Sequence, residues 1–76
     1  MDLKEFISNF ASQFEETAMN EFSSETYFKN MKEWSSLTAL SIIAMIDEEY
    51  GVAIKGNDIR KAETIEDLFN VVKSLK

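Results

Sequence analysis

Two adjacent serines, Ser35 and Ser36, stand immediately before a long apolar segment that ends at Tyr50 and Gly51. A serine at the start of a helix accepts a hydrogen bond from one of the free backbone N–H groups there. The remaining N–H groups and the positive end of the helix dipole favour a phosphate at the same place. Two interpretations of Ser36 are therefore open: it is only a structural cap, or its hydroxyl bears a phosphate-containing group. Either serine could be the cap, and periodicity does not separate them.

The chain lacks the side chains on which most enzymatic chemistry depends. It contains no histidine, the commonest general base, and no cysteine, so serine hydrolases and thiol enzymes both lack a component. The usual soft zinc ligands are absent for the same reason. Asp47, Glu48 and Glu49 do not have the alternating oxygen ligands and glycine spacing of a calcium loop, and the cluster is typical of a solvated helix face. We predict neither a catalytic residue nor a metal site.

Length and charge further limit the kind of protein that this chain can be. The 76 residues suffice for one small domain spanning 1–76, and 45% of them are hydrophobic. Eight basic and fourteen acidic side chains give a net charge of −6, which disfavours nucleic acid and is compatible with basic protein partners. No apolar segment approaches the ~20 residues of a membrane span, and the first residues lack the pattern of a signal peptide. We expect a soluble, cytoplasmic monomer that does not bind membranes.

Helical periodicity appears first near the N-terminus. An apolar stripe predicts an amphipathic helix of about four turns, fading through Ala18. The members of this stripe are Leu3, Phe6, Ile7, Phe10 and Phe14. Residues 20–35 are predicted to form a connection with a turn or two of helix, fixed to the bundle by four apolar side chains. These side chains are Phe22, Phe28, Met31 and Trp34.

The segment 36–50 predicts a second long helix, with Gly51 as its left-handed C-cap. It carries more apolar residues than one buried face requires. The stripe that is predicted to be buried comprises Ala39, Ile42, Ile43, Ile46 and Tyr50. A second stripe comprises Leu37, Leu40 and Ala44, with Glu48 following one turn on. Either the second stripe is a partly exposed docking surface with an acidic border, or both stripes are core.

The remaining residues predict two further helices. After an extended link at 52–54 and a turn at 55–58, Asp58 is expected to cap a short helix that runs through Lys61. Thr64 and Asp67 have the spacing of a capping box and open the last helix. The apolar stripe of this helix is Ile65, Leu68, Phe69, Val72 and Leu75. The predicted fold class is all-α: a small antiparallel four-helix bundle with three longer helices and one short helix.

The ordered set of these features resembles the acyl carrier proteins, which bind phosphopantetheine, across nearly the whole chain. The run from Trp34 to Thr38 is similar to the Trp-Asp-Ser-Leu-Thr version of the family's Asp-Ser-Leu motif, which is typical of specialised carriers. The acidic, aromatic helix end at 46–52 and the segments 58–59 and 64–68 also look like those of the family. Two departures stand out. Ser35 replaces the family's usual aspartate, and Thr38 and Ser41 replace acidic residues of the fatty-acid members.

The resemblance implies a non-catalytic carrier. A separate phosphopantetheinyl transferase would use coenzyme A to attach a 4′-phosphopantetheine arm to the hydroxyl of Ser36. Acyl or aminoacyl groups would then be held as thioesters on the arm's thiol. Enzymes of fatty-acid, polyketide or related lipid biosynthesis would transfer and process these groups.

The resemblance also implies where partners bind and what the interior can hold. The implied partner-binding residues are Leu37, Leu40, Ala44, Asp47 and Glu48. In the family an acyl chain can shelter between the helices, but the rings of Phe6, Phe10, Phe28 and Phe69 would leave little room for one here. The alternative to a carrier is an unmodified, carrier-like helical domain that binds other proteins.

Overall fold

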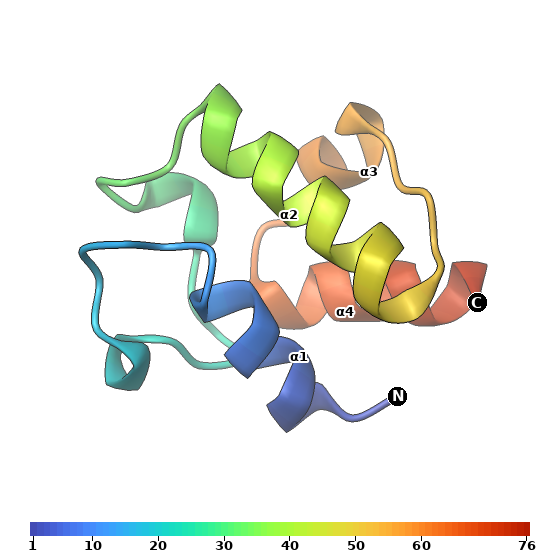
Figure 1. Cartoon of the computed structure of the whole chain (residues 1–76), viewed down its shortest axis with the longest axis horizontal. Helices are drawn as coiled ribbons and strands as arrows, with labels where there is room; N and C mark the ends of the chain where they lie inside the picture. Colours follow the sequence, from blue (N-terminus) through green and yellow to red (C-terminus); the bar gives the residue numbers. More distant parts are fainter.

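The computed structural model describes residues 1–76 and contains four α-helices and no β-strand. The helices are α1 (Leu3–Ala11), α2 (Ser36–Tyr50), α3 (Gly56–Lys61) and α4 (Ile65–Leu75). In Figure 1, α1 runs in the direction opposite to α2 and α4, while the short α3 lies beyond α2. Helix α1 contacts both α2 and α4, and α3 contacts α4. The predicted all-α bundle of three longer helices and one short helix is confirmed.

Helix α1 is shorter than predicted. Its N-cap is Asp2, whose carboxylate accepts the N–H of Lys4, and its last residue is Ala11. The predicted length of about four turns is therefore wrong. The N–H groups of Gln13 and Phe14 bond instead to carbonyls three residues back, as in a tightening turn. The hydroxyl of Ser12 bonds the carbonyl of Asn9 and so competes with the helical pattern. Phe14 is nevertheless buried, because the chain turns it back onto the bundle, whereas Ala18 is exposed.

The connection between α1 and α2 contains two single-turn 3₁₀ helices, at Met19–Glu21 and Phe28–Asn30. This confirms the short helical turns that were predicted there. Phe22 and Phe28 are buried, and Met31 and Trp34 pack against the core while remaining partly exposed. The rings of Phe28 and Trp34 meet edge to face at 4.9 Å, a favourable arrangement for an aromatic pair. The residues just before α2 are therefore anchored to the core.

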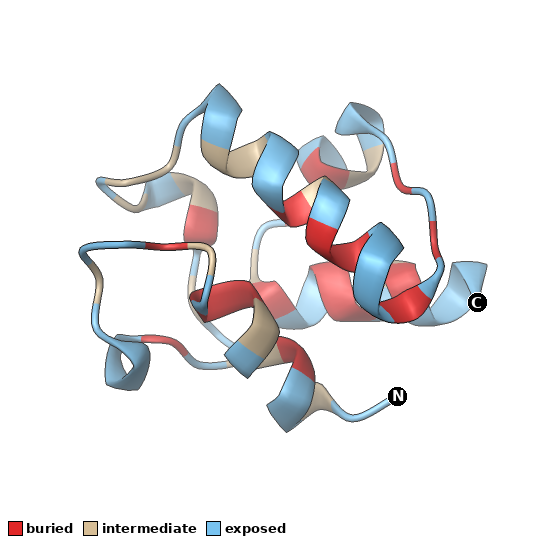
Figure 2. Cartoon of the chain, in the orientation of Figure 1, coloured by how far each residue is buried: buried red, intermediate tan, exposed pale blue.

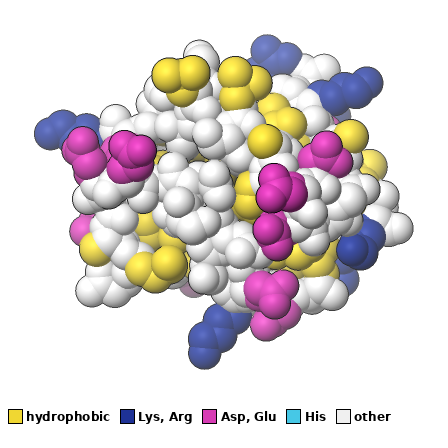
Figure 3. Space-filling model, viewed as in Figure 1, with side chains coloured by type: hydrophobic (Ala, Val, Ile, Leu, Met, Phe, Trp, Pro, Cys, Tyr) yellow, Lys and Arg dark blue, Asp and Glu magenta, His cyan; other side chains and the backbone are white.

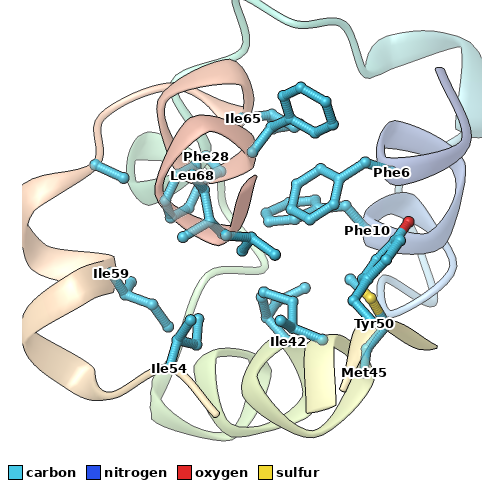
Figure 4. Packing of buried hydrophobic residues seen from close by; sticks show 14 of the residues in the cluster. Phe6, Phe10, Phe28, Ile42, Met45, Tyr50, Ile54, Ile59, Ile65 and Leu68 are labelled. Atoms are coloured by element: carbon cyan, nitrogen blue, oxygen red, sulfur yellow. The ribbon is translucent and has the colours of Figure 1, made fainter. Parts of the chain in front are cut away.

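The core is apolar throughout. Figure 4 shows side chains from all four helices directed into one interior, and Figure 2 shows the same buried positions along the ribbon. Eighteen residues are buried, and none of them is polar or charged. The largest fully buried side chains are Phe6, Phe10, Phe28, Ile42, Ile46, Ile65, Leu68 and Val72. Phe6 joins three elements, because its ring lies 5.5 Å from that of Phe69 and 5.7 Å from that of Tyr50.

The helix ends follow local hydrogen bonding. Gly51 ends α2 with φ 67, in the left-handed region that favours glycine, as predicted. Thr64 and Asp67 form the predicted reciprocal capping box at 3.1 and 3.0 Å. Asp58, however, is not the cap of α3: the helix already starts at Gly56, and Asp58 accepts the N–H of Lys55 from its third position. Leu75 is 54% exposed, so the buried stripe of α4 ends at Val72.

Candidate functional site

Ser35 and Ser36 have different places at the start of α2. Ser35 is the N-cap, with an extended backbone and with its hydroxyl accepting the N–H of Thr38 at 3.3 Å. Ser36 is the first helical residue and is exposed, and its hydroxyl forms no hydrogen bond with the rest of the chain. The structure thus decides which serine is the cap: Ser35 caps the helix, and the hydroxyl of Ser36 is free.

Two backbone N–H groups at the start of α2, beside this free hydroxyl in the chain, are also unpaired. The N–H groups of Ser36 and Leu37 have no acceptor in the chain, because they precede the first turn of the helical hydrogen-bond ladder. The N–H of Ala39 is the first to be bonded within that ladder, to the carbonyl of Ser35 at 2.9 Å. Two free N–H groups and the positive end of the α2 dipole can therefore stabilise an anion on Ser36.

The serines are held by contacts from the preceding connection. The hydroxyl of Thr38 donates to the carbonyl of Glu33 at 2.8 Å. The carboxylate of Glu33 in turn accepts the hydroxyl of Thr17 and, at 3.0 Å, the N–H of Glu16. These bonds join the turn after α1 to the start of α2. Sequence reasoning missed this function of Glu33, since its partners lie 16 and 17 residues away and no local pattern marks such a contact.

The five implied partner-binding residues are all exposed on α2. Leu37 and Leu40 are 76% and 61% exposed, which is unusual for large apolar side chains, and Ala44, Asp47 and Glu48 are exposed as well. Figure 3 shows hydrophobic side chains over the first half of α2 and acidic ones over its second half. The interpretation in which both apolar stripes are core is therefore wrong.

The stripe expected to be buried is confirmed only in part. Ile42, Ile46 and Tyr50 are buried, but Ala39 and Ile43 remain partly exposed. Met45, which was not assigned to either stripe, is buried instead, and its position three residues after Ile42 was the available signal. The inward face of α2 is thus rotated slightly toward Met45, and this rotation leaves Ala39 and Ile43 beside a surface groove.

That groove has a volume of about 670 Å³ and lies next to Ser36. Its apolar wall is formed by residues from the connection, α2 and α3, namely Trp34, Ala39, Leu40, Ile43 and Ile59. Ser35, Ser36 and Gly56 also line it, together with the basic residues Lys29 and Arg60. A group attached to Ser36 would therefore have an apolar surface within its immediate reach.

Charge on Glu33 should contribute to stability in a pH-dependent way. The hydrogen bond from the Thr17 hydroxyl, helped by backbone N–H groups, holds the pKa of Glu33 below its ordinary value. A carboxylate with a lowered pKa stabilises the folded state above its unfolded-state pKa of about 4.3, and this stabilisation is lost as the pH falls through the folded-state value. We expect Glu33→Gln to lower the urea midpoint at neutral pH, and we expect this deficit relative to the wild type to shrink as the pH is lowered to about 3.

The matched control is Glu25→Gln, because the carboxylate of Glu25 accepts none of the chain's hydrogen bonds. Its urea midpoint should follow that of the wild type at both pH values. A deficit in Glu33→Gln that stayed equally large in acid would contradict the charge-dependent contact.

Comparisons with known proteins place no further constraint on this site. No family model, no curated protein and no solved structure matches the chain. No group of three or more acidic side chains is arranged to hold a metal ion. None of the helices has the length and hydropathy that crossing a membrane requires. The likeness to acyl carrier proteins therefore remains a prediction from the residues.

Proposed function

We propose that this protein is an acyl carrier protein that bears a 4′-phosphopantetheine arm on Ser36. The observation that carries the proposal is that the two serines have different structural roles: Ser35 caps α2, whereas the hydroxyl of Ser36 is exposed and forms no hydrogen bond. Modification of Ser36 therefore costs the helix no hydrogen bond. The free N–H groups of Ser36 and Leu37 suit a phosphodiester at that oxygen.

Ser36 would act as the acceptor in a reaction that another enzyme catalyses. Its hydroxyl oxygen attacks the phosphorus of coenzyme A that bears the pantetheine, and an O–P bond forms as the bond to the adenosine bisphosphate leaving group breaks. The serine proton passes to a base of the transferase, because this chain has no histidine to take it. When bound, the arm supplies the thiol that the chain lacks, and acyl or aminoacyl groups are carried on it as thioesters.

Partner enzymes would bind the exposed side of α2. Leu37, Leu40 and Ala44 offer apolar area next to Ser36, and Asp47 and Glu48 offer negative charge further along. A partner with an apolar patch bordered by basic residues would match both. The transferase and the enzymes of fatty-acid, polyketide or related biosynthesis would share this surface in turn, with the carrier acting as a cytoplasmic monomer.

The test is the intact mass of the purified chain after incubation with coenzyme A and a broad-specificity phosphopantetheinyl transferase. We expect the mass to increase by one phosphopantetheine group. Ser35→Asp, which keeps a good N-cap and supplies an acidic contact for the transferase, should be modified faster. A wild-type chain that stays unmodified while Ser35→Asp is modified would favour the alternative, an interaction domain that has lost modification.

A further inference from the structure

The groove beside Ser36 differs in charge from the rest of the surface. The chain has fourteen acidic and eight basic side chains, yet two basic residues and no acidic residue line this groove. The field of the whole protein repels anions, whereas the groove is locally cationic. In Figure 3, basic side chains lie near α3, beyond the hydrophobic side chains of the first half of α2.

The two cations are held in place by neutral acceptors. The ammonium group of Lys29 donates to the backbone carbonyl of Arg60 at 2.8 Å. The guanidinium group of Arg60 donates to the side-chain oxygen of Asn57. Glu63 lines a smaller hollow together with Lys29, but it does not line the groove. Both positive charges are therefore fixed at the groove without a carboxylate bound to them.

The interior of the bundle offers no comparable space for a carried group. Phe6, Phe10 and Phe28 are completely buried and pack ring against ring at 5.3 to 6.5 Å. The groove is an apolar hollow that Ser36 itself lines, with Trp34, Leu40 and Ile43 on its wall. A chain attached through Ser36 is held at high effective concentration beside it.

We infer that the groove binds an apolar chain that ends in a carboxylate. The chain lies along Trp34, Leu40 and Ile43, and the carboxylate meets Lys29 and Arg60, whose guanidinium fork matches its two oxygens. The inference rests on the proposed function in one respect: if Ser36 bears the arm, the preferred cargo is an acyl group with a second carboxylate remote from the thioester. A neutral acyl chain would cover the same apolar wall but would leave the two cations without an anionic partner.

The first experiment uses the unmodified chain and does not depend on loading. Trp34 is the only tryptophan and lies in the groove, so its fluorescence reports occupancy. We expect octanoate to bind about three- to tenfold more tightly than octanol, and acetate to produce no comparable change. Lys29→Met combined with Arg60→Met should reduce octanoate binding to the level of octanol. The matched control, Lys32→Met with Lys61→Met, removes the same charge outside the groove and should keep the preference.

The second experiment compares cargo on the arm. The transferase is supplied with coenzyme A, octanoyl-coenzyme A or suberoyl-coenzyme A, the last having the same chain with a terminal carboxylate. We expect the suberoyl form to shift Trp34 fluorescence more than the octanoyl form does, and the shift to disappear in the Lys29→Met, Arg60→Met variant. The form loaded with coenzyme A alone tests whether the arm's own phosphodiester occupies the cations.

The outcomes separate the two proposals. If the chain cannot be loaded, the carrier function is contradicted, while octanoate binding still decides the groove. Equal binding of octanoate and octanol would overturn the inference. A full Trp34 shift with the bare arm, or equal shifts for octanoyl and suberoyl forms, would overturn the assignment of the cargo class.

Discussion

Ser36→Ala is expected to abolish attachment of the phosphopantetheine arm completely while leaving the fold intact. The reaction needs the hydroxyl oxygen at this position, and alanine offers none. The stability of the variant should stay within about 0.5 kcal/mol of the wild type, because Ser36 is exposed and its hydroxyl bonds nothing in the chain. Intact mass after the transferase reaction and a urea unfolding curve measure the two effects.

Ser35→Ala is the matched control, since it removes the neighbouring hydroxyl. This change deletes the N-cap bond to the N–H of Thr38 and should cost about 0.5–2 kcal/mol. Its Ser36 should still accept the arm. Loss of modification in Ser35→Ala with retention in Ser36→Ala would show that the roles of the two serines are reversed.

The largest loss of stability is expected for Phe10→Ala. Phe10 is completely buried, and its ring packs against those of Phe14, Phe22 and Phe28 at 5.3 to 6.3 Å. Removing such a ring typically costs about 3–5 kcal/mol, much of the roughly 5–15 kcal/mol that stabilises a small domain. The variant should unfold at far lower urea concentration than the wild type or be largely unfolded.

Two substitutions on α2 test the assignment of the core even if Phe10→Ala does not fold. Ile42→Ala removes a fully buried side chain and should cost about 2–5 kcal/mol. Leu40→Ala removes a side chain that is 61% exposed and should change stability by only about 0.5 kcal/mol, while slowing the transferase by weakening its docking. Equal losses of stability in Ile42→Ala and Leu40→Ala would contradict the orientation of α2.

The limits of α2 could be predicted because their signals are local. A serine cap before the apolar run and a glycine after it mark the two ends, and the observed helix, Ser36–Tyr50, has the predicted limits. The end of α1 could not be predicted in the same way. Phe14 continues the apolar periodicity although the helix stops at Ala11, because periodicity reports which residues are buried and a turn can bury one as well as a helix can.

In the candidate site too, the features set by local sequence could be predicted, and those set by tertiary packing could not. The position of Ser36 and the exposure of Leu37 and Leu40 follow from one helix and its period, so the sequence could indicate them. The cationic side of the groove could not be foreseen. Lys29 and Arg60 are 31 residues apart, and only the packing of the connection against α3 brings them together.

The most direct measurement is peptide mapping of the chain by tandem mass spectrometry after reaction with coenzyme A and the transferase. The carrier account predicts one phosphopantetheine group per chain, located on Ser36. Attachment to Ser35 would contradict the division of roles at the start of α2. A chain that remains unmodified under conditions in which a known carrier is fully modified would contradict the carrier function itself.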